Sequence, residues 1–231
     1  MLLYGIDMTY IYYVLPALIF TIIAQIGIKR AYSKMSQVYS ANGYTGADIA
    51  QRILHNAGVG NVAVVPISGE MTDNFNPKTN TVSLSQGVYS STSIAAAGIA
   101  AHECGHAIQH AIGYAPIKLR RVMVPVCNIG STLAMPIILI GFILETQNMV
   151  NLGILFFALA VFFQLVTLPV EFNASRRAME CLRDDGILTE YELPKARKVL
   201  TAAAMTYVAA LAVSLMQLIR LIILFGGSDR D

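Results

Sequence analysis

Four long apolar stretches constrain the fold of this 231-residue chain more than any other feature. They cover approximately residues 11–28, 122–144, 149–170 and 202–225. Each has close to the roughly 20 apolar residues that a helix needs to cross a bilayer. Only 13% of the residues are charged, which is about half the share found in soluble domains. The sequence therefore predicts a mainly α-helical, polytopic membrane protein with about four transmembrane helices.

The positions of the basic residues predict the orientation of these helices. Lys and Arg residues follow the first stretch, precede the second and lie between the third and fourth, but residues 145–148 contain none. Because positive residues favour the cytoplasmic side of a membrane, we expect both termini outside and residues 29–121 and 171–201 inside. The basic residues of these two inner segments near the spans are Lys29, Arg30, Lys34, Lys118, Arg120, Arg121, Arg176, Arg177, Arg183, Lys195, Arg197 and Lys198.

These boundaries predict the organisation of the chain. Asp7 precedes the first apolar stretch and no small-residue cleavage site follows it, so this stretch is expected to be a retained anchor and not a cleaved signal. The predicted parts are an N-terminal anchor (1–28), a cytoplasmic segment (29–121), two transmembrane helices (122–170), a cytoplasmic helical segment (171–201), and a C-terminal transmembrane helix with its tail (202–231).

The first cytoplasmic segment has the pattern of a small α+β domain. Apolar residues recur with helical period over 45–58, where Thr45 and Asp48 are spaced as a capping box. Residues 61–67 and 81–85 are typical of strands, and the Asn- and Pro-rich residues between them (73–80) indicate a turn. A second helix is predicted from Ser93 to near Gly113. We expect 80–86 to be an edge strand, onto which an extended peptide could add by main-chain pairing.

The second predicted helix carries the motif His-Glu-Cys-Gly-His at residues 102–106. On a helix His102 and His106 project from one face, where two neutral imidazoles can bind one zinc ion. Glu103 then stands beside a zinc-activated water as a general base. This HExxH pattern predicts a zinc-dependent hydrolase whose cofactor is Zn²⁺.

A catalytic zinc site has three protein ligands, so one more is needed. His110 lies about 12 Å along the helix from His102, too far for one tetrahedral ion. A metzincin site is excluded, because it would need Gly and His where the chain has Gln109 and Ile112. Glu171, directly after the third apolar stretch where a carboxylate is costly, is the preferred third ligand. The alternative carboxylates are Glu180, Asp184, Asp185, Glu70 and Asp73.

Three segments, 93–109, 68–77 and 168–178, resemble the YugP-type bacterial membrane zinc metallopeptidases, and with the apolar stretches the resemblance covers most of residues 10–225. It implies a multi-pass enzyme of the bacterial plasma membrane with a zincin-like, gluzincin-type site. Distantly similar membrane peptidases, related to the CAAX-processing enzymes, place Asp four residues after the ligand Glu, where this chain has Ser175. We expect Ser175 or Asn173 to contact the second nitrogen of a ligand imidazole instead.

The expected partners follow from this interpretation. They are a peptide or membrane-protein substrate and the lipid bilayer, with no oligomeric state predicted. Nucleic acid is not expected, because the chain has no basic stripe interleaved with aromatic residues. For the oxyanion of the reaction, Arg176 and Arg177 are candidate donors, with Tyr114 and Tyr207 as weaker ones.

Two other functions are compatible with the motif. One is an intramembrane metalloprotease, although only about eight apolar residues precede His102, too few to cross a bilayer. The other is a non-catalytic membrane scaffold that binds zinc, although a structural zinc site normally has a fourth protein ligand. Cys104 faces away from His102 on a helix and does not supply one.

Overall fold

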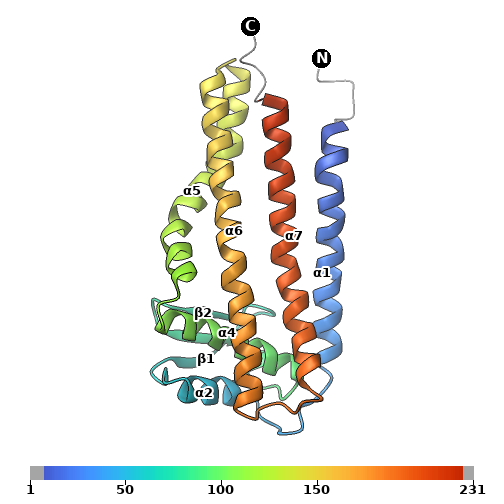
Figure 1. The fold of residues 1–231 in the computed structure, drawn as a ribbon, viewed down its shortest axis with the longest axis vertical. Coiled ribbons are helices and arrows are strands. Elements are labelled where there is room, and N and C mark those ends of the chain that lie inside the picture. Colours follow the sequence, from blue (N-terminus) through green and yellow to red (C-terminus); the bar gives the residue numbers. More distant parts are fainter. Residues whose placement is uncertain (1–7, 226–231) are drawn as a thin grey trace. The chain divides into compact units, whose positions relative to one another are not determined.

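The computed structural model describes residues 8–225, in which long helices accompany one small sheet (Figure 1). Four helices are long and apolar enough to cross a membrane, which confirms the four predicted stretches. The first begins as a π-helix at Tyr10–Val14 and continues as α1 (Leu15–Met35). The others are α5 (Ala115–Ile143), α6 (Gln147–Asp184) and α7 (Leu193–Phe225). Each of these three helices begins before or ends after its apolar stretch by several residues. The helices therefore also include residues of the segments between the apolar stretches.

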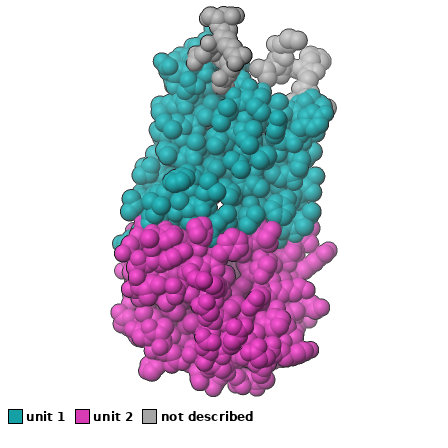
Figure 2. All heavy atoms as spheres, viewed as in Figure 1, with its two compact units in different colours: residues 1–25, 119–168, 206–231 teal, residues 26–118, 169–205 magenta. Residues whose placement is uncertain are grey.

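The chain divides into two compact units (Figure 2). Unit 1 comprises residues 1–25, 119–168 and 206–231, and unit 2 comprises residues 26–118 and 169–205. Helices α1, α6 and α7 each contribute residues to both units.

Unit 1 contains the most apolar parts of the four helices. Ile138 of α5, Val150 of α6 and Leu221 of α7 form a buried cluster, and Gln164 Nε2 donates a hydrogen bond to Ser214 Oγ at 2.9 Å. Many large apolar side chains remain exposed, which is the pattern of helices that face lipid. These side chains include Ile22, Ile23, Val126, Ile129, Phe162 and Ile222.

Unit 2 contains a three-stranded sheet in the order β1-β3-β2. β1 (Ala63–Ile67) pairs in parallel with β3 (Thr81–Ser85), and β2 (Asn74–Asn76) pairs with β3 in antiparallel orientation. Val82 and Leu84 of β3 are fully buried, and the strand predicted at 81–85 is confirmed.

One prediction for this region is wrong and another is wrong in part. The expectation that 80–86 forms an edge fails because β3 is the central strand, and β1 and β2 are the edges. The expectation of a turn over 73–80 fails in part because these residues also contain β2. Asn is rare in strands, and only pairing with β3, which is not visible in local sequence, makes this segment extended.

The helices of unit 2 begin where their capping residues predict. Thr45 and Asp48 form the capping box of α2 (Gly46–Asn56), and Ser93 Oγ accepts a hydrogen bond from the Ala96 N–H at the start of α4 (Ile94–Ala111). A short helix, α3 (Gln86–Tyr89), links β3 to α4. The core lies between α2, the sheet, α4 and the nearby ends of α6 and α7. Its fully or almost fully buried residues include Ile49, Ile53, Leu54, Val82, Leu84, Ile94, Ala101, Cys104, Ala178 and Leu182.

Within this core α4 and α6 approach each other closely at Gly105. A Cβ atom at Gly105 would lie 2.6 Å from the carbonyl oxygen of Ala174, a separation that real Cβ atoms do not adopt. The neighbouring Cys104 and Ala178 are also small and buried. The absence of a side chain at Gly105 therefore sets the distance between the two helices.

We predict that Gly105→Ala destabilises the protein by about 1–3 kcal/mol, because the added methyl group must push α6 away from α4. Gly98→Ala is the matched control on the same helix, since its Cβ would meet Ala196 only at an ordinary 3.7 Å. This control should be neutral or slightly stabilising, because Ala favours helix over Gly. Thermal unfolding of the two variants in detergent is the measurement, and equal midpoints would contradict the steric argument.

Candidate metal centre

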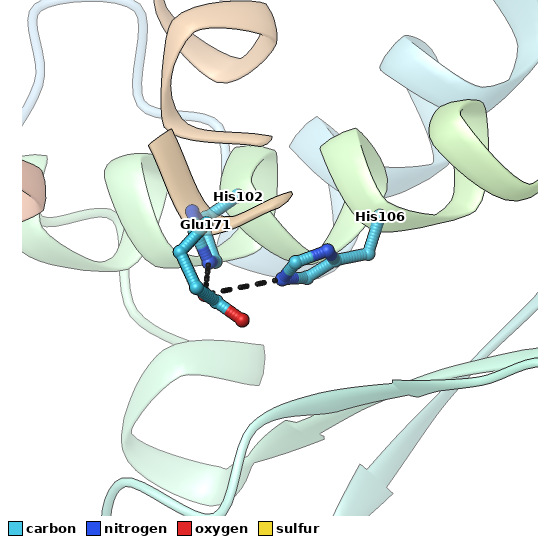
Figure 3. Close-up of side chains that lie close together, drawn as sticks. All are labelled: His102, His106 and Glu171. Atoms are coloured by element: carbon cyan, nitrogen blue, oxygen red, sulfur yellow. Dashed lines mark ion pairs between the residues drawn. The ribbon is translucent and has the colours of Figure 1, made fainter. Parts of the chain in front are cut away.

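Three side chains from two helices of unit 2 converge at one point (Figure 3). Glu171 Oε2 of α6 lies 3.3 Å from His102 Nε2 and 3.5 Å from His106 Nε2 of α4. The three potential ligand atoms lie within 4.8 Å of one another. Among the residues that the structure describes, these three side chains form the group of His, Cys, Asp and Glu residues that could hold a metal ion.

The three residues differ in their exposure. Glu171 is 2% exposed, whereas the side chains of His102 and His106 retain 16% and 12% exposure. The centroids of the two imidazole rings are 4.7 Å apart, and the ring planes are almost perpendicular, with an interplanar angle of 84°. The carboxylate is thus buried while solvent still reaches the imidazoles, as a metal site with an open coordination position requires.

The surroundings of His106 affect its proton affinity. Burial lowers the pKa of this imidazole, but the hydrogen bond to Glu171 and the negative charges of Glu103 and Glu171 outweigh burial and raise the pKa above its ordinary value. Without a metal, the ring therefore tends to keep its proton. A metal ion that binds here must displace this proton, so metal affinity will fall as the pH is lowered.

A buried amide orients His106. Gln109, fully buried three residues later on α4, places its Oε1 3.1 Å from His106 Nδ1. Gln109 Nε2 donates to the Val170 carbonyl oxygen at 2.8 Å and to Asn173 Oδ1 at 3.0 Å. Because the amide nitrogen is engaged in this way, its oxygen accepts from Nδ1–H, and Nε2 points toward Glu171. The proton that Nε2 shares with Glu171 in the absence of a metal is the one that a bound ion would displace.

The residues after Glu171 continue this network. Ser175 Oγ lies 3.1 Å from His102 Nδ1 and can accept a hydrogen bond from Nδ1–H, as Gln109 does from His106. Asn173 does not contact an imidazole directly; its Oδ1 accepts from Gln109 and, at 2.9 Å, from Arg177 Nε. Arg176 lies 3.8 Å from Glu180 at the surface. The sequence predicts that Ser175 or Asn173 contacts a ligand imidazole in place of the missing Asp. Ser175 makes this contact with His102, whereas Asn173 contacts Gln109, which in turn contacts His106.

Gln109 is a site residue that the sequence interpretation misses. The available signal is its position three residues after His106, which places this amide on the same helix face as the ligand imidazole. A fully buried amide requires hydrogen-bond partners, and a ligand imidazole requires one for its second nitrogen.

The other candidate ligands have different neighbours. The carboxylate of Asp73 accepts hydrogen bonds from the N–H and Oγ of Ser85, and Glu180 pairs with Arg176. His110 packs against the ring of Phe75, with centroids 5.8 Å apart. The Cys104 Sγ contacts the Ala50 carbonyl oxygen at 3.6 Å.

The donor set fits zinc. Two imidazole nitrogens and one carboxylate oxygen are the ligands of many catalytic zinc sites, which keep the fourth position open. Glu103, next to His102 on α4 and 8% exposed, has no part in this ligand group but lies near enough for its charge to act on His106.

We predict that Gln109→Leu and Ser175→Ala each weaken zinc binding by roughly 10–100-fold, because each removes the partner that orients a ligand imidazole. Competition with a chromogenic chelator measures this affinity. Ser90→Ala is the control for Ser175→Ala and should bind zinc normally, because it removes an exposed hydroxyl that donates only to the Gln86 carbonyl oxygen of α3. Unchanged affinity in both test variants would exclude an orienting role.

Comparison with known proteins agrees with the composition of this site. Residues 10–226 match the family model described as "Putative neutral zinc metallopeptidase". The chain is 43% identical over 225 residues to the "Putative membrane protease YugP" of Bacillus subtilis (strain 168), covering 97% of this chain and 100% of that protein. No solved structure matches significantly. The resemblance inferred from the sequence is therefore confirmed, and the chain belongs to this family of zinc metallopeptidases.

Proposed function

We propose that this protein is a membrane-embedded zinc endopeptidase of gluzincin type, with its active site at the cytoplasmic surface of the membrane. The observation that carries the proposal is the convergence of His102, His106 and Glu171 beside Glu103. Both the family description and the name of the Bacillus relative support a peptidase. The partial exposure of the two imidazole rings favours a catalytic site over a closed structural one.

In this mechanism His102, His106 and Glu171 hold the zinc ion. A zinc ion bound there would act as a Lewis acid toward both a water molecule and the scissile carbonyl group. Glu103 accepts the proton of the attacking water and passes it to the leaving amine nitrogen. Gln109 and Ser175 keep the two imidazoles in the tautomer that presents Nε2. Arg176 and Arg177 remain the candidate oxyanion donors.

The sheet offers an edge for an extended substrate. β2 is an edge strand, and its Phe75 contacts His110, one helical turn after His106 on α4. A peptide that pairs with β2 would lie near the histidine helix, with main-chain hydrogen bonds giving affinity without strong sequence preference. Peptides and membrane proteins near the inner membrane surface are the proposed substrates.

The cytoplasmic location predicts which surfaces are accessible in whole cells. In a Cys181→Ser background, Asn148→Cys should react with a membrane-impermeant maleimide in intact cells, because residues 145–148 are expected outside. Glu190→Cys, in the segment expected inside, should react only after lysis. Both positions are exposed, so access and not burial decides the result. The reverse labelling pattern would place the site on the outer face.

The proposed chemistry predicts that Glu103→Gln lowers peptide hydrolysis by at least about 10²-fold, because the amide cannot accept the water proton. Zinc content should stay close to that of the wild type, since Glu103 is not a ligand. Glu190→Gln, which removes an exposed glutamate that pairs with Arg183, is the matched control and should keep full activity. Metal content by atomic spectroscopy and cleavage of fluorogenic peptides are the measurements.

Removal of the metal separates an enzyme from a zinc-binding scaffold. A chelator should abolish cleavage, and added zinc should restore it. His106→Ala should lose both zinc and activity, whereas His55→Ala, at an exposed position on α2, should lose neither. A protein that binds zinc through His106 but cleaves no peptide in any membrane or detergent environment would support the scaffold.

A further inference from the structure

Unit 2 has a hollow with basic residues around it that the peptidase chemistry does not use. The end of α1 and the start of α7 flank a hollow of about 630 Å³, a volume typical of ligand pockets. Buried contacts beside it hold the two helix segments together, among them Ile28 and Met35 of α1 with Val199 of α7. The hollow is thus part of the packed unit.

The residues around the hollow are basic, small or apolar. Four cationic side chains line it, two from each helix, and no acidic residue does. The apolar residues include Ala31 and Met35, which are 6% and 5% exposed. The four cations are Arg30, Lys34, Arg197 and Lys198, all exposed.

These cations have no anionic partner within the described part of the chain. None of the four forms an ion pair there, whereas Arg176 and Arg183 on α6 pair with Glu180 and Glu190. Four like charges around one hollow repel one another, so each destabilises the arrangement unless an anion neutralises it. The hollow therefore has the charge complementary to a multivalent or phosphate-containing anion.

The sequence of α1 indicates what kind of anion this is. Ile26, which belongs to the same unit, precedes Arg30 by four residues, so the two share a helix face. Ile26 is 42% exposed. A ligand bound at Arg30 thus meets cations at the hollow and an exposed apolar side chain on the same helix face, as a phosphate head group with acyl chains would require.

We propose that this hollow binds the head group of an anionic phospholipid, with the phosphate between Arg30 and Lys34 of α1 and Arg197 and Lys198 of α7. Two helices that are far apart in the sequence are thereby bridged by one lipid. Zwitterionic lipids carry the same phosphate, but their cationic head groups meet the repulsion of four positive side chains. The site accordingly favours lipids with net negative charge.

The test uses the full-length protein in nanodiscs that contain equal amounts of phosphatidylglycerol and phosphatidylcholine. After release into a neutral detergent, native mass spectrometry measures the ratio of the two lipids that remain bound. The wild type should retain phosphatidylglycerol over phosphatidylcholine. Arg30→Gln/Lys198→Gln should lower this ratio by roughly 10–30-fold, since each cation near a membrane surface contributes several-fold. Equal retention of the two lipids by the wild type would overturn the proposal.

The matched control is Lys29→Gln/Arg183→Gln, which also removes one Lys and one Arg at exposed positions but none from the hollow. It should retain phosphatidylglycerol like the wild type. Equal losses in the two double variants would show general surface attraction and overturn the proposal. Displacement of the lipid by millimolar inorganic phosphate would also overturn it, because the site would then bind a small anion and not a lipid. Peptidase activity is not needed for either readout.

Discussion

The close contact between α4 and α6 is the constraint on which the metal centre depends. Glu171 and the two histidines are far apart in the sequence, and their ligand atoms meet only because Gly105 lets the α6 backbone lie against α4 beside Ala174. The glycine inside the His-Glu-Cys-Gly-His motif therefore has a packing role. Gly105 lies between the two ligand histidines. A side chain at this position would therefore increase the distances from both imidazoles to the Glu171 carboxylate.

The same contact makes the hydrogen-bond network possible. A carboxylate that is 2% exposed is costly unless a positive group or hydrogen-bond donors compensate it, and the two imidazoles and a metal ion are suited to do so. Gln109 connects the two helices, since it contacts His106 on its own helix and Val170 and Asn173 on α6. Arg177 completes the chain by donating to Asn173. Polar side chains from both α4 and α6 thus hold the ligands in place.

Local sequence patterns predict those parts of the structure that depend on neighbouring residues alone. Apolar length identifies the membrane helices, capping residues locate the starts of α2 and α4, and helical spacing pairs His102 with His106. Features that depend on pairing between distant segments are not visible in this way. The Asn residues of β2 favour a turn, so the turn prediction fails over this strand. The central place of β3 is not a local property, so the edge prediction fails. Gln109 escapes notice for the same reason, since two of its three contacts are with α6.

The two sites of unit 2 share a neighbourhood at Arg197. This side chain lines the basic hollow and also a second, smaller one of about 260 Å³, whose wall includes Ser175. Ser175 in turn contacts His102. A lipid phosphate bound to Arg197 would restrict the motion of this side chain. The wall of the smaller hollow beside Ser175, which contacts His102, would then be more ordered. Because a long cationic side chain without an anionic partner samples many rotamers, the charge of the surrounding lipid would change the order of this wall without altering any ligand.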